Sequence, residues 1–151
     1  MTAERADLSF DLLPGVAIGP FRLGMSREEA REIARRRFGT ETEARGREGS
    51  ADWIPSLGIA VSYDANGRCT KVEVQFGYAF GDKCGVRLLG RQINWMRDDE
   101  VIRLCKDRWP DVASQGYWYD VPSAGLRLAY YDTPSDASFC SASVFPPARG
   151  Q

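Results

Sequence analysis

Apolar residues recur at helical spacing in two segments of the chain. Between Ala30 and Phe38 they fall at positions i, i+3, i+4 and i+8, which predicts an amphipathic helix. Ser26 and Glu29 form a capping box at its start, and Gly39 ends it. A second helix is predicted over 98–109, because its apolar positions show a comparable stripe and Pro110 follows.

Alternating apolar and polar positions predict the strands. Short strands at 18–23 and 86–89 precede the two helices. After the first helix, strands at 59–63 and 72–76 flank Asn66-Gly67, the strongest short signal for a β-hairpin. After the second helix, the expected strands are 117–121, 125–131 and 138–145.

The chain contains an internal repeat. Residues 53–63 match 120–130 at an offset of 67, and residues 25–30 align with 96–101 at an offset of 71. A polar loop at 40–50 accounts for the difference between the offsets.

We interpret the whole chain, 1–151, as a single domain made of two divergent copies, at about 15–80 and 84–146. The terminal segments 1–12 and 147–151 are expected to be flexible. The fold class is α+β: two tandem copies of a strand-helix-β-meander unit form an antiparallel sheet with the helices on one face.

Composition narrows the class of protein. The 151 residues are 43% hydrophobic and 27% charged, values typical of one soluble globular domain. The net charge of -1 gives no overall field toward nucleic acid or an anionic membrane, so neither is expected as a partner. No apolar stretch is long enough for a transmembrane helix or a signal-peptide core, which favours a cytoplasmic location.

Candidate chemistry is sparse. The chain has no histidine, the commonest general base and metal ligand. The cysteines form no C-x-x-C pair, so no metal or other cofactor is expected, and whether they are free or disulfide-bonded stays open. Acidic residues at the two helix starts suit the helix dipole, which favours a structural role. We therefore expect a protein that is not an enzyme, with no catalytic residues.

The aromatic residues exceed what one sheet face requires. In 117–119 and 130–131, neighbouring rings point to opposite sides of a strand, so at least one ring in each cluster faces away from the helices. Tyr and Trp are enriched where proteins meet. The expected partner-binding residues are Tyr78, Phe80, Tyr117, Tyr119, Tyr131 and Asp132. A role in the core or in a homodimer face explains the excess equally well.

Residues 18–29, Ile-Gly-Pro-Phe-Arg-Leu-Gly-Met-Ser-Arg-Glu-Glu, form a strand, a Gly-Met-Ser turn and a helix opening. This stretch resembles the units of bacterial tandem α/β repeat proteins: the β-lactamase-inhibitor-like group, the outer-membrane assembly lipoproteins and small cytoplasmic immunity proteins. The resemblance implies a non-enzymatic module that binds protein. Exported members carry signal or lipobox segments that this sequence lacks, which favours the immunity-like variant.

The favoured hypothesis is a cytoplasmic immunity or inhibitor protein that neutralises a partner protein, such as a toxin, through a sheet face and the linker 77–85. The first alternative is a small-molecule-binding domain or an unrecognised small enzyme. The second alternative is a structural homodimer. The sequence specifies neither the partner nor which sheet face binds it.

Overall fold

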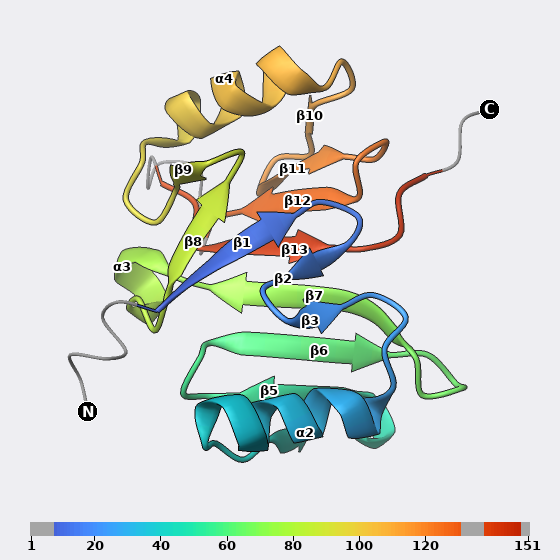
Figure 1. Ribbon diagram of the computed structural model, residues 1–151. Helices are drawn as coiled ribbons and strands as arrows, with labels where there is room; N and C mark the ends of the chain where they lie inside the picture. The colour runs from blue at the N-terminus through green and yellow to red at the C-terminus, as the bar shows by residue number, and fades with distance from the viewer. Residues whose placement is uncertain (1–7, 131–137, 149–151) are drawn as a thin grey trace.

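The computed structural model describes residues 8–130 and 138–148, and it shows an α+β fold with two sheets (Figure 1). Two long helices, α2 (Arg27–Phe38) and α4 (Asp98–Arg108), are accompanied by the short α3 (Gly77–Phe80) and a 3-10 turn, η1 (Arg47–Gly49). The strands are β1 (Ser9–Leu13), β2 (Ala17–Ile18), β3 (Phe21–Arg22), β4 (Glu43–Arg45), β5 (Ala51–Ile54), β6 (Ile59–Tyr63), β7 (Cys69–Gln75), β8 (Gly85–Leu88), β9 (Arg91–Gln92), β10 (Ala113–Ser114), β11 (Trp118–Val121), β12 (Leu126–Ala129) and β13 (Ser141–Val144).

The larger sheet has eight strands in the order β10-β11-β12-β13-β7-β6-β5-β4, and all neighbours are antiparallel. Its central pair is β7 and β13, with Val72 opposite Val144. On each side of this pair, the strands follow the chain from the edge of the sheet to its centre. The element order is thus the same in both halves; that the halves are two copies of one unit stays a prediction.

The smaller sheet has the order β3-β2-β1-β8-β9, and here the structure corrects two expectations. Residues 9–12, expected to be flexible, belong to the central strand β1, because Phe10 and Leu12 alternate inward and are buried. The pair β1–β8 is parallel, so the strands are not all antiparallel. At the other end of the chain, Ala148 donates its N–H to the Pro122 carbonyl at 2.8 Å, which holds part of the segment expected to be flexible.

Local signals in the first half are confirmed. Ser26 Oγ accepts from the Glu29 N–H at 3.1 Å, and Glu29 Oε1 accepts from the Ser26 N–H at 3.2 Å, which completes the capping box of α2. The β6–β7 hairpin turns at Gly67, which has φ +74°. The expected strand at 18–23 is interrupted at Gly19, where φ is +58°, and becomes the hairpin β2–β3.

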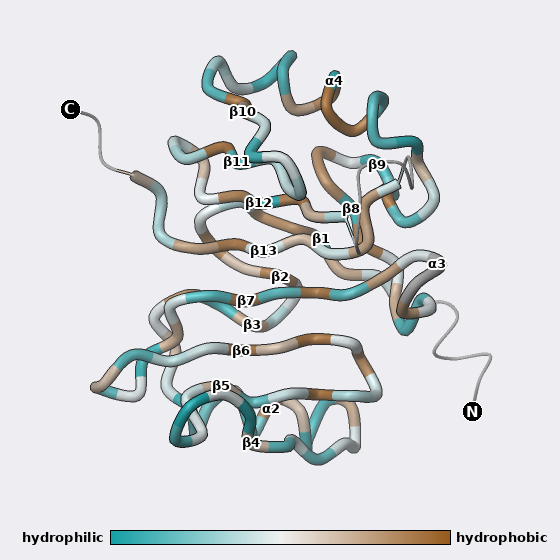
Figure 2. Tube along the Cα trace, turned by 180° about the vertical axis from the view of Figure 1, so that it is seen from behind, coloured by the Kyte–Doolittle hydropathy of each residue, from teal (hydrophilic) through white to brown (hydrophobic). Residues whose placement is uncertain are grey.

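Both long helices and the smaller sheet lie on one face of the larger sheet (Figure 1). Arg31 of α2 contacts Asp52 of β5, and Asp98 of α4 accepts a hydrogen bond from Tyr130 Oη at 2.7 Å. Asp52 and Tyr130 point to the same side as the core residues of the larger sheet. Seen from behind, β12, β13, β7 and β6 have no helix in front of them (Figure 2). In the described part of the chain, no helix has the length and apolarity to cross a membrane.

Candidate functional site

The side of the larger sheet that faces away from the helices is the main candidate site, and we call it the outer face. Its residues alternate along each strand with the buried core residues. Across seven strands, directly paired positions make one continuous row: Glu43, Trp53, Ala60, Glu73, Ser143, Arg127 and Asp120. The row is partly open to solvent along most of its length, so a second molecule can reach it.

Each end of the outer face carries a tryptophan stacked with an arginine. Arg127 lies 4.6 Å from the ring centroid of Trp118. Asp120 accepts two hydrogen bonds from Arg127, at 2.7 and 3.1 Å, and one from Trp118 Nε1 at 3.3 Å. These three residues, the β11 cluster, hold one another in fixed orientations. The pKa of Arg127 lies above its usual value, chiefly because Asp120 accepts its hydrogen bonds.

The opposite end repeats this chemistry. Arg45 lies 5.6 Å from the ring centroid of Trp53 and pairs with Glu43 at 3.1 Å. We call these three residues the β5 cluster. Trp53 and Trp118 are separated by five strand spacings, about 24 Å at roughly 4.8 Å per strand. Arginine and tryptophan are the residue types most enriched at the energetic centres of protein interfaces.

Small side chains occupy much of the outer face between the two clusters. They are Ala60, Ser62, Ala129, Ser141 and Ser143. Because these side chains are small, the backbone of another molecule can approach the sheet closely here. The two tryptophans flank this region. This part of the outer face also carries charge. Glu73 lies opposite Ser143, and its Oε1 is 4.0 Å from Lys71 Nζ. The outer face therefore offers close approach, aromatic anchors and both signs of charge.

The structure does not bring all the expected partner-binding residues together on this face. Tyr119 is in phase with the buried Val121, so it points toward the helices, where its ring meets Phe139 edge-on at 6.0 Å. Tyr117 precedes β11 and is exposed. The ring of this cluster that faces away is Trp118, which was not among the expected residues.

Two of the other expected residues, Tyr78 and Phe80, lie in the linker 77–85. The remaining two, Tyr131 and Asp132, come after β12 in the sequence. Phe80 is exposed at the end of α3. Tyr78 belongs to α3, but its side chain lies outside the described part of the structure, as do residues Tyr131 and Asp132. That these three residues bind a partner therefore stays a prediction.

A buried asparagine, which the sequence patterns did not indicate, organises the linker. Asn94 Nδ2 donates to Asp82 Oδ1 at 2.8 Å and to the Cys84 carbonyl at 2.9 Å, and its Oδ1 accepts from the Val86 N–H at 2.6 Å. Asp82 Oδ1 also accepts from the Gly77 N–H at 2.8 Å. These bonds fix the path of the linker. A single asparagine between a short strand and a helix carries no sequence signal for such a role.

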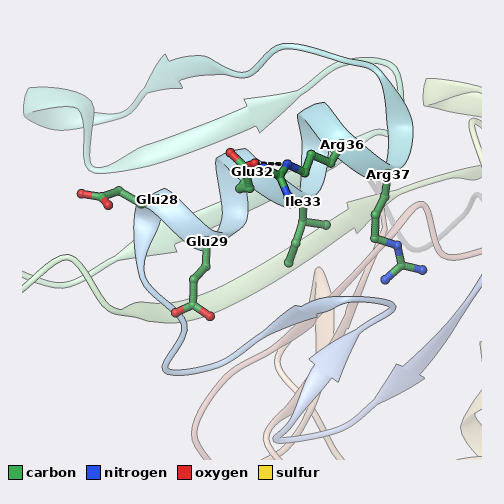
Figure 3. A pocket seen from close by; sticks show the side chains of 6 residues that line it. All are labelled: Glu28, Glu29, Glu32, Ile33, Arg36 and Arg37. Atoms are coloured by element: carbon green, nitrogen blue, oxygen red, sulfur yellow. Dashed lines mark ion pairs between the residues drawn. The ribbon is translucent and has the colours of Figure 1, made fainter.

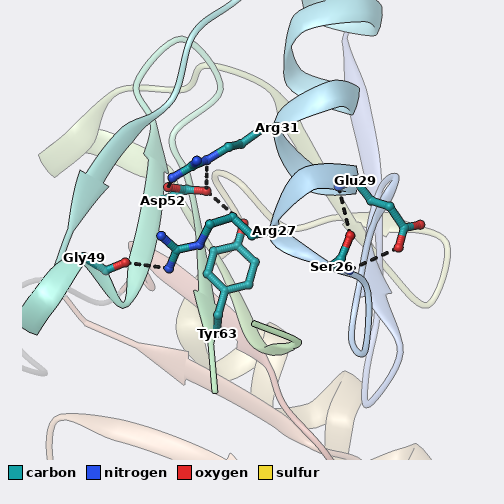
Figure 4. A network of polar contacts seen from close by, with 7 residues as sticks. All are labelled: Ser26, Arg27, Glu29, Arg31, Gly49, Asp52 and Tyr63. Atoms are coloured by element: carbon teal, nitrogen blue, oxygen red, sulfur yellow. Dashed lines mark hydrogen bonds and ion pairs between the residues drawn. The ribbon is translucent and has the colours of Figure 1, made fainter. Parts of the chain in front are cut away.

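A second polar cluster lies on the covered side, where α2 meets β5 and β6 (Figure 4). The buried Asp52 accepts from Arg31 Nε at 3.0 Å, from Arg31 Nη2 at 3.1 Å and from Tyr63 Oη at 3.0 Å. Arg27 lies over the Tyr63 ring at 4.5 Å and donates to the Gly49 carbonyl. Burial, with Asp52 as neighbour, raises the pKa of Tyr63, which therefore stays protonated. This cluster joins the helix to the sheet.

The open surface of α2 carries a shallow pocket of about 480 Å³ (Figure 3). It is lined by Glu28, Glu29, Glu32, Ile33, Arg36 and Arg37. Glu32 pairs with both Arg35 and Arg36, and Glu29 caps the helix. The charges of this pocket are therefore largely engaged by their own helix.

All four cysteines are buried, and Cys69, Cys84 and Cys105 are free thiols. Burial raises the thiol pKa of Cys69 to about 11 and of Cys84 and Cys105 to about 12, so these three are neutral thiols at physiological pH. Among the described residues, no group of three or more Cys, Asp or Glu side chains is placed to hold a metal ion.

Comparison of the chain with protein-family models, with curated proteins and with solved structures found no match. The likeness of residues 18–29 to tandem α/β repeat proteins therefore stays a prediction.

Proposed function

We propose that this protein is a non-enzymatic protein-binding module whose outer face docks a partner protein, and that it acts as a cytoplasmic immunity or inhibitor protein that neutralises a toxin. The observation that supports the proposal most is an eight-stranded sheet with one side that no helix or strand of residues 8–130 and 138–148 covers. Sheets that lack a cover usually present polar side chains to water on that side. Besides such polar side chains, this side presents two tryptophans, each stacked with an arginine.

Fixed anchors favour protein binding for an energetic reason. Association costs conformational entropy whenever a side chain must be ordered at the interface. In the β11 cluster, Asp120 already holds Arg127 and Trp118 in place before any partner arrives. A partner that spans both clusters would cover roughly 24 Å of sheet, a reach suited to a protein surface rather than a small molecule.

Site-specific photo-crosslinking in the source cell tests this proposal. A benzophenone amino acid would replace Ser62 or Ser141 on the outer face, and Glu28 on the exposed surface of α2 serves as the control. We expect the same foreign protein to be captured from both outer-face positions and not from position 28. Absence of adducts from the outer face, or adducts only between copies of this chain, would contradict the proposal.

The inhibitor part of the proposal has its own test. Equimolar addition of the purified chain should abolish the measurable activity of the captured partner. If the partner binds the outer face but keeps its full activity, the protein-binding part of the proposal holds and the inhibitor part is contradicted.

A further inference from the structure

The charged side chains on the outer face are paired with one another. The β5 cluster and the β11 cluster each contain one acidic and one basic side chain that form an ion pair. On the central strand β7, Glu73 Oε1 lies 4.0 Å from Lys71 Nζ. Among the described strands of the larger sheet, the remaining charged residue is Asp52, which lies on the covered side. The charge that these strands present on the outer face is therefore balanced.

Two of the pairs are joined into one row of alternating charge. Ser143 lies opposite Glu73 on one side and opposite Arg127 on the other, so the carboxylate and the guanidinium flank the same serine. The pKa of Arg127 is raised first by the hydrogen bonds that Asp120 accepts and also by the negative charge of Glu73. Across the sheet the order is Lys71, Glu73, Arg127 and Asp120, and the sign changes at each step. Neither sign of charge predominates along this row.

This balance limits the charge that a partner can carry. Charged interfaces usually place a patch of one sign against a patch of the other sign. A strongly basic or acidic partner would bring its charges against carboxylates and basic groups that already have partners, so it would lose hydration and gain little attraction. A partner surface without net charge leaves the existing pairs intact and can still cover the tryptophans and the small side chains between them.

We propose that the partner protein docks on the outer face through a surface that carries no net charge. This inference rests on the proposed function and narrows the chemistry of the partner. A basic surface, of the kind with which proteins bind nucleic acids, is thereby excluded as the docked surface. Association is then driven by the aromatic anchors and by close packing, and long-range charge attraction does not speed it.

The salt dependence of binding tests the inference. The probe is the purified partner captured by photo-crosslinking from positions 62 and 141, titrated with the full chain in NaCl. Between roughly 50 and 500 mM NaCl, we expect the Kd to change by less than about 5-fold, because no net charge is neutralised on binding. A larger loss of affinity over this range would overturn the inference.

Single-charge variants on β7 give a second test that depends on the sign of the effect. Lys71→Gln and Glu73→Gln each leave one charge unpaired at the centre of the outer face, so both should weaken binding, by roughly 5-fold. The double variant Lys71→Gln/Glu73→Gln should recover most of the lost affinity, because it leaves neither charge of this pair. Lys106→Gln and Glu28→Gln are the matched controls, since they change the net charge by the same amounts on exposed helix surfaces.

A charged partner gives the opposite pattern. A basic partner would bind Lys71→Gln more tightly and Glu73→Gln more weakly, and an acidic partner would do the reverse. Either pair of opposite effects overturns the inference but leaves the outer face as the docking surface. Failure of the proposed function is distinguishable, because in that case positions 62 and 141 capture no foreign protein.

Discussion

Arg31 on α2 donates two hydrogen bonds, at 3.0 and 3.1 Å, to Asp52 on β5, a carboxylate that is 1% exposed while its partner is 43% exposed. Removal of Arg31 leaves the buried carboxylate with Tyr63 as its remaining side-chain donor in the described structure. Because Arg31 is partly solvated, we expect Arg31→Met to lower the free energy of unfolding by about 2–3 kcal/mol, below the range for a fully buried pair.

Urea unfolding of matched variants measures this cost. Arg35→Met is the control, because Arg35 occupies the same helix but pairs with Glu32 at the exposed surface. That variant should lose less than about 0.5 kcal/mol. Equal losses in the two variants would show that the Asp52 pair contributes no more than a surface ion pair.

Gly125 is the tightest backbone approach among the glycines of the described structure. A Cβ there would lie 2.1 Å from the Phe145 carbonyl oxygen and 3.0 Å from Gly15 Cα, and φ is +71°. We expect Gly125→Ala to cost more than about 3 kcal/mol, since backbone on both sides must move.

Gly67→Ala measures the cost of the positive φ alone, without the steric clash that a Cβ causes at Gly125. Gly67 has φ +74°, but a Cβ at this position would have no neighbouring atom within 4 Å, so the variant should lose only about 1–2 kcal/mol. Thermal unfolding compares the two, and soluble yield ranks them if Gly125→Ala does not fold. Similar losses would mean that the close approach of residues 145–148 is not important for stability.

Alkaline pH should weaken the fold. The Cys105 thiol has a pKa of about 12 in the folded state against 9.0 ordinarily, because it is buried. Between these values the unfolded chain loses a proton that the folded chain keeps, so the free energy of unfolding falls as pH rises; below pH 9.0 the contribution is present in full. Each such thiol contributes a slope of up to about 1.4 kcal/mol per pH unit.

Cys105→Ala tests this linkage through the slope of the free energy of unfolding against pH, rather than through its value at one pH. The variant should unfold more easily at every pH because of its cavity, but its stability should fall less steeply than that of the wild type between pH 9 and about 11. Chemical unfolding at several pH values gives both slopes. Identical slopes would show that the thiol already ionises in the folded protein.

Local sequence patterns predicted the helices and the β6–β7 hairpin because their determinants lie within a few residues. Ser26, Glu29 and Gly39 fix α2 without help from the rest of the chain. Strand β1 was missed because its alternation, Phe10 and Leu12, is short and follows a charged segment, and its parallel partner is 76 residues away in the chain.

The candidate site required knowledge of which residues face the core. The motif Tyr117-Trp118-Tyr119 predicts that neighbouring rings point to opposite sides, but it does not say which side is covered. Tyr119 lies two positions before the buried Val121 on the same strand, so it faces the covered side, and Trp118 faces the outer side. The β5 cluster depends on the cross-strand pairing of Glu43 with Trp53, which no local pattern specifies.

The central claim is that the outer face binds a partner protein. The most direct test is to measure the equilibrium binding of the partner identified by photo-crosslinking to tryptophan variants of this chain. Trp53→Ala and Trp118→Ala should each weaken binding by about 30-fold, equivalent to roughly 2 kcal/mol at an interface anchor, while each variant stays folded. Trp95→Ala, which removes an exposed tryptophan elsewhere, should bind like the wild type. Unchanged affinity in both outer-face variants would contradict the account.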